Sequence, residues 1–312
     1  MTQSLLGDLL LADVVAINTG LSLVLGSLAS THWLREAQSL WSDAARARGT
    51  VARRVGLVVT LIGLLCAVWS QAALMGDTPL LQAGSTAQVL LRDTHFGHVA
   101  LAGLVAWCVI TASSWHAAPL GRVRFGILGM GLAALLWSRS AAAHAGSQGD
   151  VSIDVCIDAV HLLAACLWVG MVFVAVMFHL PSISLPKQNR LDATQWVTAL
   201  SSTATAALVV VVITGSFKIW RPTYSLTALV TSDYGWVLGS KVALVAIAAA
   251  MGGFNRFRVL PGLFDGLRAD AGSEATASWD RRLKIVLRAE AIVLFSVLIA
   301  AAILAGMETP AE

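Results

Sequence analysis

Eight long apolar stretches constrain this 312-residue chain more than any other feature. Each is about 20 residues long, the length that an α-helix needs to cross the hydrocarbon core of a bilayer. They lie near residues 9–31, 53–75, 95–116, 123–144, 153–180, 196–219, 236–256 and 284–306. None shows the alternating pattern of a membrane β-strand. The sequence therefore predicts an all-α fold, a polytopic membrane helical bundle of about eight transmembrane helices that forms a single transmembrane domain over residues 1–312.

The composition excludes several classes of protein. Charged residues make up 12% of the chain, about half the usual share, and apolar residues 57%. The polar loops expected near residues 35–52 and 258–282 are too short for a soluble module, and no phosphate-binding loop occurs. No Lys or Arg precedes the first apolar stretch, so we expect no cleavable signal peptide. We therefore expect neither an ATPase nor any other enzyme, and no nucleic-acid partner.

The basic residues predict the orientation in the membrane. Sixteen of the 21 Lys and Arg residues fall in the loops that follow the first, third, fifth and seventh spans. Lys and Arg concentrate in cytoplasmic loops, so these loops should be cytoplasmic. Both termini should then be periplasmic, in a multi-pass protein of a bacterial inner membrane.

The seven histidines lie near the ends of the apolar spans and sort to two depths. Four belong to the periplasmic side, and imidazole is the commonest protein ligand for transition metals. His95 and His98 stand three residues apart, close enough for both to reach one ion. Together with two nearby carboxylates they give a candidate metal site of His95, His98, His144, His161, Asp158 and Asp93.

The fifth span carries the densest polar pattern. Asp154, Asp158, His161 and Trp168 are spaced so that they line one stripe of a helix. Ionisable groups inside a membrane are costly unless they face protein or water, so the stripe indicates a path for a metal or a proton. The alternative is that the carboxylates lie in the headgroup zone and the imidazole bonds a neighbouring helix.

The other three histidines, His32, His116 and His179, should lie on the cytoplasmic side and form a second candidate site. His98 and His116 are 18 residues apart, as are His161 and His179, which is about 27 Å along a helix. The spacing fits two sites at opposite faces. It also fits interfacial residues that end two equally long helices, and it permits the alternative of haem b held between facing helices.

Sulfur would favour copper among the metals that imidazole binds. The candidate sulfur ligands are Met171, Met307 and Cys156. The four cysteines form no CxxC pair, and most methionines are expected to be packing residues. The other buried charges, Lys241, Glu290 and Asp13, are expected to be structural. Glu290 lies at a depth where it could form an ion pair with Arg256.

The second half of the chain resembles the CopD family of bacterial copper-resistance membrane proteins. Residues 144–307 carry the likeness, through His144-Ala-Gly146, Asp158-Ala-Val-His161, Trp168-Val-Gly170, Thr231-Ser-Asp-Tyr234-Gly235, Lys241, Gly253-Phe-Asn255-Arg256, Pro261 and Glu290. Asp93-Thr-His95-Phe-Gly97 extends a weaker likeness into the third span. The chain departs from the family's Trp-x-Gly-Gly at the second glycine, where it has Met171.

The resemblance implies copper, as Cu(I) or Cu(II), taken up from the periplasm and moved or relayed across the membrane. It also implies a separate periplasmic CopC-like copper-binding partner, because the chain has no fused domain of that kind. A haem-binding electron-transfer protein is the alternative, and an assembly protein with purely interfacial histidines is a third. Copper ions and membrane lipids are the expected ligands in the leading interpretation.

Overall fold

The computed structural model describes residues 3–115, 121–143, 149–179, 187–220, 231–269 and 274–307. Nearly all of these residues are helical, and none of them forms a β-strand. The N-terminal elements are α1 (Gln3–Trp33), α2 (Leu40–Met75), η1 (Leu80–Gln82), α3 (Gly84–Asp93), α4 (His95–Ser114) and α5 (Arg122–Ala141). The C-terminal elements are α6 (Ile153–Val174), η3 (Ala175–His179), α7 (Lys187–Trp220), α9 (Asp233–Phe254), η4 (Asn255–Val259), α10 (Leu260–Ala269) and α11 (Glu274–Gly306).

The predicted helical membrane bundle is confirmed. Seven of the described helices, α1, α2, α4, α6, α7, α9 and α11, are long and apolar enough to cross a membrane. The fourth predicted span coincides with α5, which is not among the seven and carries Arg122, Arg124 and Arg139 within its 20 residues. Eight crossings therefore remain a prediction.

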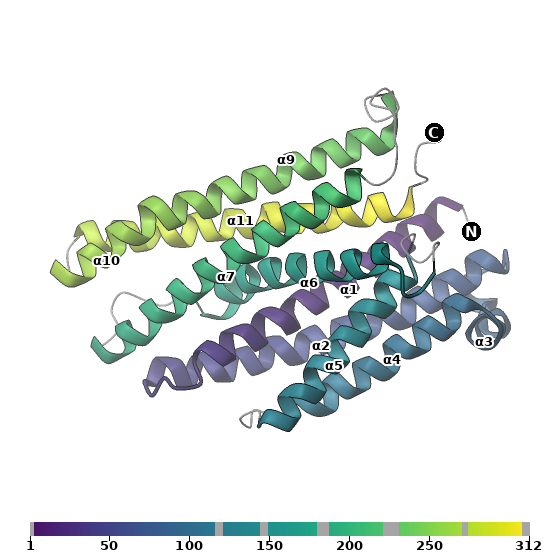
Figure 1. The fold of residues 1–312 in the computed structure, drawn as a ribbon, viewed down its shortest axis with the longest axis horizontal. Coiled ribbons are helices and arrows are strands. Elements are labelled where there is room, and N and C mark those ends of the chain that lie inside the picture. The colour runs from purple at the N-terminus through teal and green to yellow at the C-terminus, as the bar shows by residue number, and fades with distance from the viewer. Residues whose placement is uncertain are drawn as a thin grey trace.

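All the long helices run lengthwise through one bundle (Figure 1). α1 and α6 lie inside it, with α4 and α5 along one side and α9, α10 and α11 along the other. α1 begins and α11 ends at the same end of the bundle, as an even number of crossings requires. Which face of the membrane each end occupies remains the prediction made from the Lys and Arg distribution.

Three helices begin well before the predicted spans. α2 begins at Leu40, α7 at Lys187 and α11 at Glu274, so the expected loops near 35–52 and 258–282 are largely helical. The Ser39 hydroxyl caps α2 by accepting a hydrogen bond of 3.2 Å from the Ser42 amide. The extensions are stable because they bury apolar side chains of their own, and Trp41 packs edge-on against Trp196 with ring centroids 6.1 Å apart.

Small residues let α1 approach its neighbours closely. Gly20 faces Thr60 and Gly56 of α2, and Gly26 faces Gly170 of α6. An alanine Cβ at any of these glycines would overlap atoms of the facing helix. Close packing of this kind drives helix association in lipid, where apolar burial between helices gains little.

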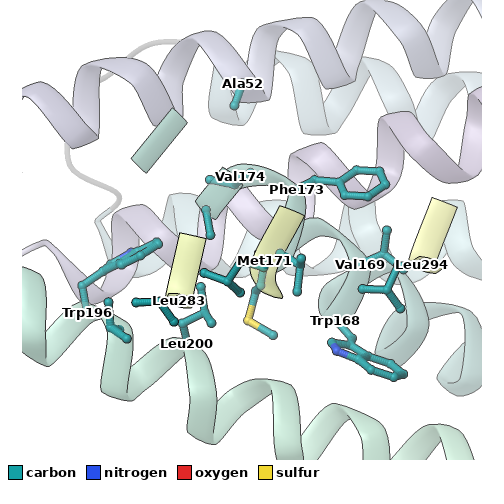
Figure 2. Packing of buried hydrophobic residues seen from close by; sticks show 14 of the residues in the cluster. Ala52, Trp168, Val169, Met171, Phe173, Val174, Trp196, Leu200, Leu283 and Leu294 are labelled. Carbon is teal, nitrogen blue, oxygen red and sulfur yellow. The ribbon is translucent and has the colours of Figure 1, made fainter. Parts of the chain in front are cut away.

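The largest buried cluster joins α6, α7 and α11, and it includes Trp168, Met171, Leu200, Leu283 and Leu294. Figure 2 shows Met171 among these side chains. Its exposed fraction is 1%. The residue that stands in place of the second family glycine therefore fills the core.

Candidate functional site

The first polar group lies where α4 begins. The Thr94 hydroxyl caps α4 by accepting a hydrogen bond of 3.0 Å from the Gly97 amide. His95 Nε2 lies 2.7 Å from Asp150 Oδ1, in the short loop before α6. His98 Nε2 lies 2.9 Å from the Arg92 carbonyl oxygen, and both imidazoles are exposed.

The second polar group lies between α6 and α7. Asp158 forms an ion pair with Lys218. One turn deeper, His161 Nδ1 lies 2.8 Å from Thr214 Oγ1. Gly215, the next residue of α7, also faces the imidazole, since a Cβ there would make an ordinary contact of 3.4 Å with His161 Cε1.

The hydrogen-bond chain indicates which His161 nitrogen carries the proton. Thr214 donates its only hydroxyl hydrogen to the Val210 carbonyl oxygen, 2.6 Å away. Thr214 must therefore accept from His161, so Nδ1 is protonated and Nε2 keeps its lone pair. An outer hydrogen bond that fixes the tautomer and the ring orientation is typical of metal-binding histidines. A carbonyl oxygen can only accept, so His98 donates from Nε2 to the Arg92 carbonyl oxygen.

Basic side chains outnumber carboxylates in this second group. Besides Lys218, Lys241 of α9 interacts electrostatically with both Asp158 and His161. Arg139 of α5 interacts with Asp158, and its Nε has no hydrogen-bond partner. A cation that binds Asp158 must therefore replace Lys218 and tolerate two further positive charges.

The predicted periplasmic ligands are brought to one end of the bundle but do not close around a single point. Val99 of α4, Ala141 of α5 and Val155 of α6 share one buried cluster, which places the two polar groups at the same end. Within the ranges that the structure describes, no three His, Cys, Asp or Glu side chains stand close enough to hold one metal ion. Asp93 is exposed at the end of α3. His144 lies outside the described residues, so the six-residue site stays a prediction.

The three candidate sulfur ligands have different surroundings. Met171 is packed in the core, Cys156 is exposed near the start of α6, and Met307 is half-buried just beyond α11. Packing in the core accounts for the burial of Met171, and its role as a ligand remains a prediction. No contact in the described part of the chain brings Cys156 or Met307 to the histidines, and their role as ligands remains a prediction.

Of the three histidines predicted on the cytoplasmic side, His32 is the one whose side chain the structure describes. This exposed histidine lies at the end of α1, its ring centroid 6.5 Å from that of Phe125. It also borders a cavity of about 290 Å³ that Arg35, Glu36 and Asp192 help to line. His116 lies outside the described residues, and His179 is placed only as the last residue of η3. The second site is therefore untested.

The haem alternative gains no support from these contacts. His95, His98 and His161 bond a carboxylate, a backbone carbonyl and a hydroxyl, respectively. None of these contacts identifies a pair of imidazoles that could ligate one haem iron.

Sequence reasoning missed Asp150, Thr214 and Lys218. A signal existed for Lys218, because a lysine inside an apolar helix requires a partner. Thr214 lies four residues before it, on the same helix face. Asp150 follows Gly149, whose φ of 104° marks a turn, but only the folded loop brings this carboxylate to His95.

The expected ion pair between Glu290 and Arg256 is wrong. Arg256 Nη1 instead donates to Ser201 Oγ of α7 at 3.1 Å. Sequence could place both groups at similar depth, but it could not set the rotation of α9 that turns Arg256 toward α7. Glu290 remains buried with an exposed fraction of 3%.

Comparison with known proteins identifies one family. The family model described as copper resistance protein D matches residues 194–304, which contain Thr214, Lys218, Lys241 and Glu290. No curated protein matches the chain, and no solved structure does. Residues 194–304 therefore match the CopD family, which supports the resemblance found in the sequence, and the long apolar helices fit a multi-pass membrane protein.

Proposed function

We propose that this protein moves or relays copper from a periplasmic His/Asp group into and across the bacterial inner membrane. The observation that carries the proposal is the contact between the polar stripe of α6 and the family-matched α7, where His161 meets Thr214 and Asp158 meets Lys218. This contact joins side chains that can bind a transition metal to the part of the chain that matches a copper-resistance family.

The geometry suggests an order of contacts for the ion. His95 and Asp150 lie where the chain enters α6, and Asp158 lies roughly 8 Å along α6 from Ile153. Copper would first meet the exposed imidazoles of His95 and His98 and would then reach His161 Nε2. Exposed ligands at the mouth capture the ion, and the partly buried pair receives it.

Lys218 gives the inner position a competitor for the metal. Its ammonium already occupies the carboxylate that copper would use, so binding of the ion requires Lys218 to swing away. Its side chain is 44% exposed, which leaves room for that movement. The K218Q variant should therefore bind copper more tightly than the wild type, whereas D158N should bind it less tightly.

The test is copper analysis of protein purified without added metal, together with its absorption spectrum and the copper content of the expressing cells. H161Q and D158N should reduce bound copper and change cellular copper, and a Soret band should be absent. E274Q is the control, because it neutralises an exposed carboxylate outside both candidate metal sites. Wild-type protein without copper, combined with unchanged cellular copper in H161Q, would refute the proposal.

A separate periplasmic CopC-like donor fits the exposed imidazoles at the mouth. Its test is transfer of copper from such a donor, loaded with the metal, to the wild type and to H95Q. Slower transfer to H95Q, with unchanged transfer to E274Q, would support a docking role for that end of the bundle. Equal transfer to all three proteins would remove it.

A further inference from the structure

Glu290 is a carboxyl group in the middle of α11 that the proposed copper path does not use. It is buried, and the Trp168 indole of α6 is its hydrogen-bond partner. No charged side chain of the described residues interacts electrostatically with it. Arg256, next to Asn255 in η4, bonds Ser201, and His161 lies two turns from Trp168 along α6. The group therefore lies in the apolar interior without a counter-ion from the described chain.

A second buried polar group faces the same helix. Asn255 has an exposed fraction of 5%, and neither its Oδ1 nor its Nδ2 has a hydrogen-bond partner. It begins η4, a π-helical turn that packs against α11. Gly252 lies one turn earlier, and a Cβ there would stand 3.4 Å from Glu290 Oε1. The side of α9 and η4 that packs against α11 therefore carries a buried amide without a hydrogen-bond partner, and one turn before this amide the same side approaches the Glu290 carboxyl group.

The burial of Asn255 and Glu290 in this arrangement indicates that an ion or a small ligand binds at these two side chains. Buried polar groups are normally hydrogen-bonded, and π-turns inside helices are frequent at functional sites. A bare carboxylate in a low-dielectric interior is strongly unfavourable unless a cation neutralises it. Hard metal ions take six or more oxygen ligands, far more than one carboxylate and one amide provide. A proton needs a single oxygen.

We propose that Glu290 is a proton-binding site separate from the copper ligands, with Asn255 as its positioning residue. When the proton is bound, the neutral carboxylic acid can donate its O–H toward the amide oxygen. When the proton leaves to water at the nearer membrane face, Trp168 and the Asn255 amide can both donate to the carboxylate. The amide group is suited to both states because it carries a donor and an acceptor.

The experiment is infrared spectroscopy of the full-length protein in lipid nanodiscs, without copper, after labelling with ¹³C-glutamate. The chain has five glutamates, and only Glu290 lies within a predicted span. At neutral pH the wild type should show the carbonyl band of a protonated carboxyl group, and the label should shift that band. The band should be lost in E290Q and kept in E274Q, which changes an exposed glutamate. N255L should shift the band or the pH at which it disappears.

Three results would overturn the proposal. They are the absence of a label-sensitive band at every pH at which the protein stays folded, persistence of the band in E290Q, and loss of the band when Na⁺ replaces K⁺. The last would assign the site to an alkali cation. If E290Q does not fold, the labelled wild type decides alone. Copper is not present in these measurements, so failure of the copper proposal would leave their outcome unchanged.

Discussion

Replacing Gly170 by alanine should force α6 away from α1. A Cβ at this position would overlap the Ser22 carbonyl oxygen and lie 2.6 Å from the Ser22 carbonyl carbon. It would also lie 3.0 Å from the Gly26 nitrogen. All three atoms belong to the backbone of α1, so no change of side-chain rotamer can relieve the overlap.

The size of the effect follows from these distances. Bringing the Cβ to an ordinary contact of 3.4 Å from the Ser22 carbonyl carbon alone requires about 0.8 Å, and the overlap with the carbonyl oxygen requires a larger separation. Overpacking a tight interface costs about 1–3 kcal/mol, and a backbone clash belongs at the upper end of that range. Alanine regains about 1 kcal/mol in helix propensity. We expect G170A to lower the free energy of unfolding by about 2 kcal/mol in all.

The matched control is G239A, because Gly239 lies in α9 with nothing within 4 Å of its would-be Cβ. This variant should be neutral or more stable by up to about 1 kcal/mol. The assay is unfolding by increasing SDS in mixed micelles, followed by far-UV circular dichroism. G26A should resemble G170A, and the double variant should lose less than the sum because one separation relieves both overlaps. Equal stability of G170A and G239A would show that the reasoning about this contact is mistaken.

Three further substitutions test local claims. M171A should lower the free energy of unfolding by about 2–5 kcal/mol in the same assay, whereas M171L should retain stability and bound copper unless the sulfur is a ligand. T94A should cost about 1 kcal/mol through loss of the α4 cap, and T94S should not. T214V should weaken copper binding by about 10–100-fold in a competition titration by freeing the His161 ring, while T214S should stay near wild type. Unchanged affinity in T214V would remove Thr214 from the site.

The sequence was sufficient to predict the spans, because apolar length is a one-dimensional property. α4 begins at His95 as predicted, and α6 begins at Ile153, the first residue of the predicted fifth span. The early starts of α2 and α11 could not be predicted, because those extensions are held by tertiary contacts such as the one between Trp41 and Trp196. Hydropathy locates where a helix must be in lipid, but it does not show where the helix stops outside it.

The sequence could predict how deep the site residues lie in the membrane, but it could not predict which side chains they contact. Periodicity placed Asp158 and His161 on one stripe of α6, and the structure turns both toward α7. The identity of their partners depends on how far each helix is rotated about its axis, and that rotation is set by close contacts elsewhere, such as Gly26 against Gly170. The same dependence explains why Arg256 meets Ser201 instead of Glu290.

A lysine at the centre of a proposed metal path has a physical rationale. Conduction requires binding that is favourable enough to admit an ion and weak enough to release it. Asp158 and His161 alone would hold copper firmly in a partly dry setting, where an ion and its ligands attract strongly. With Lys218 able to return to Asp158, each departing ion leaves a carboxylate that is already neutralised. Release then exposes no bare charge, and the ammonium group that weakens binding also lowers the barrier to transfer.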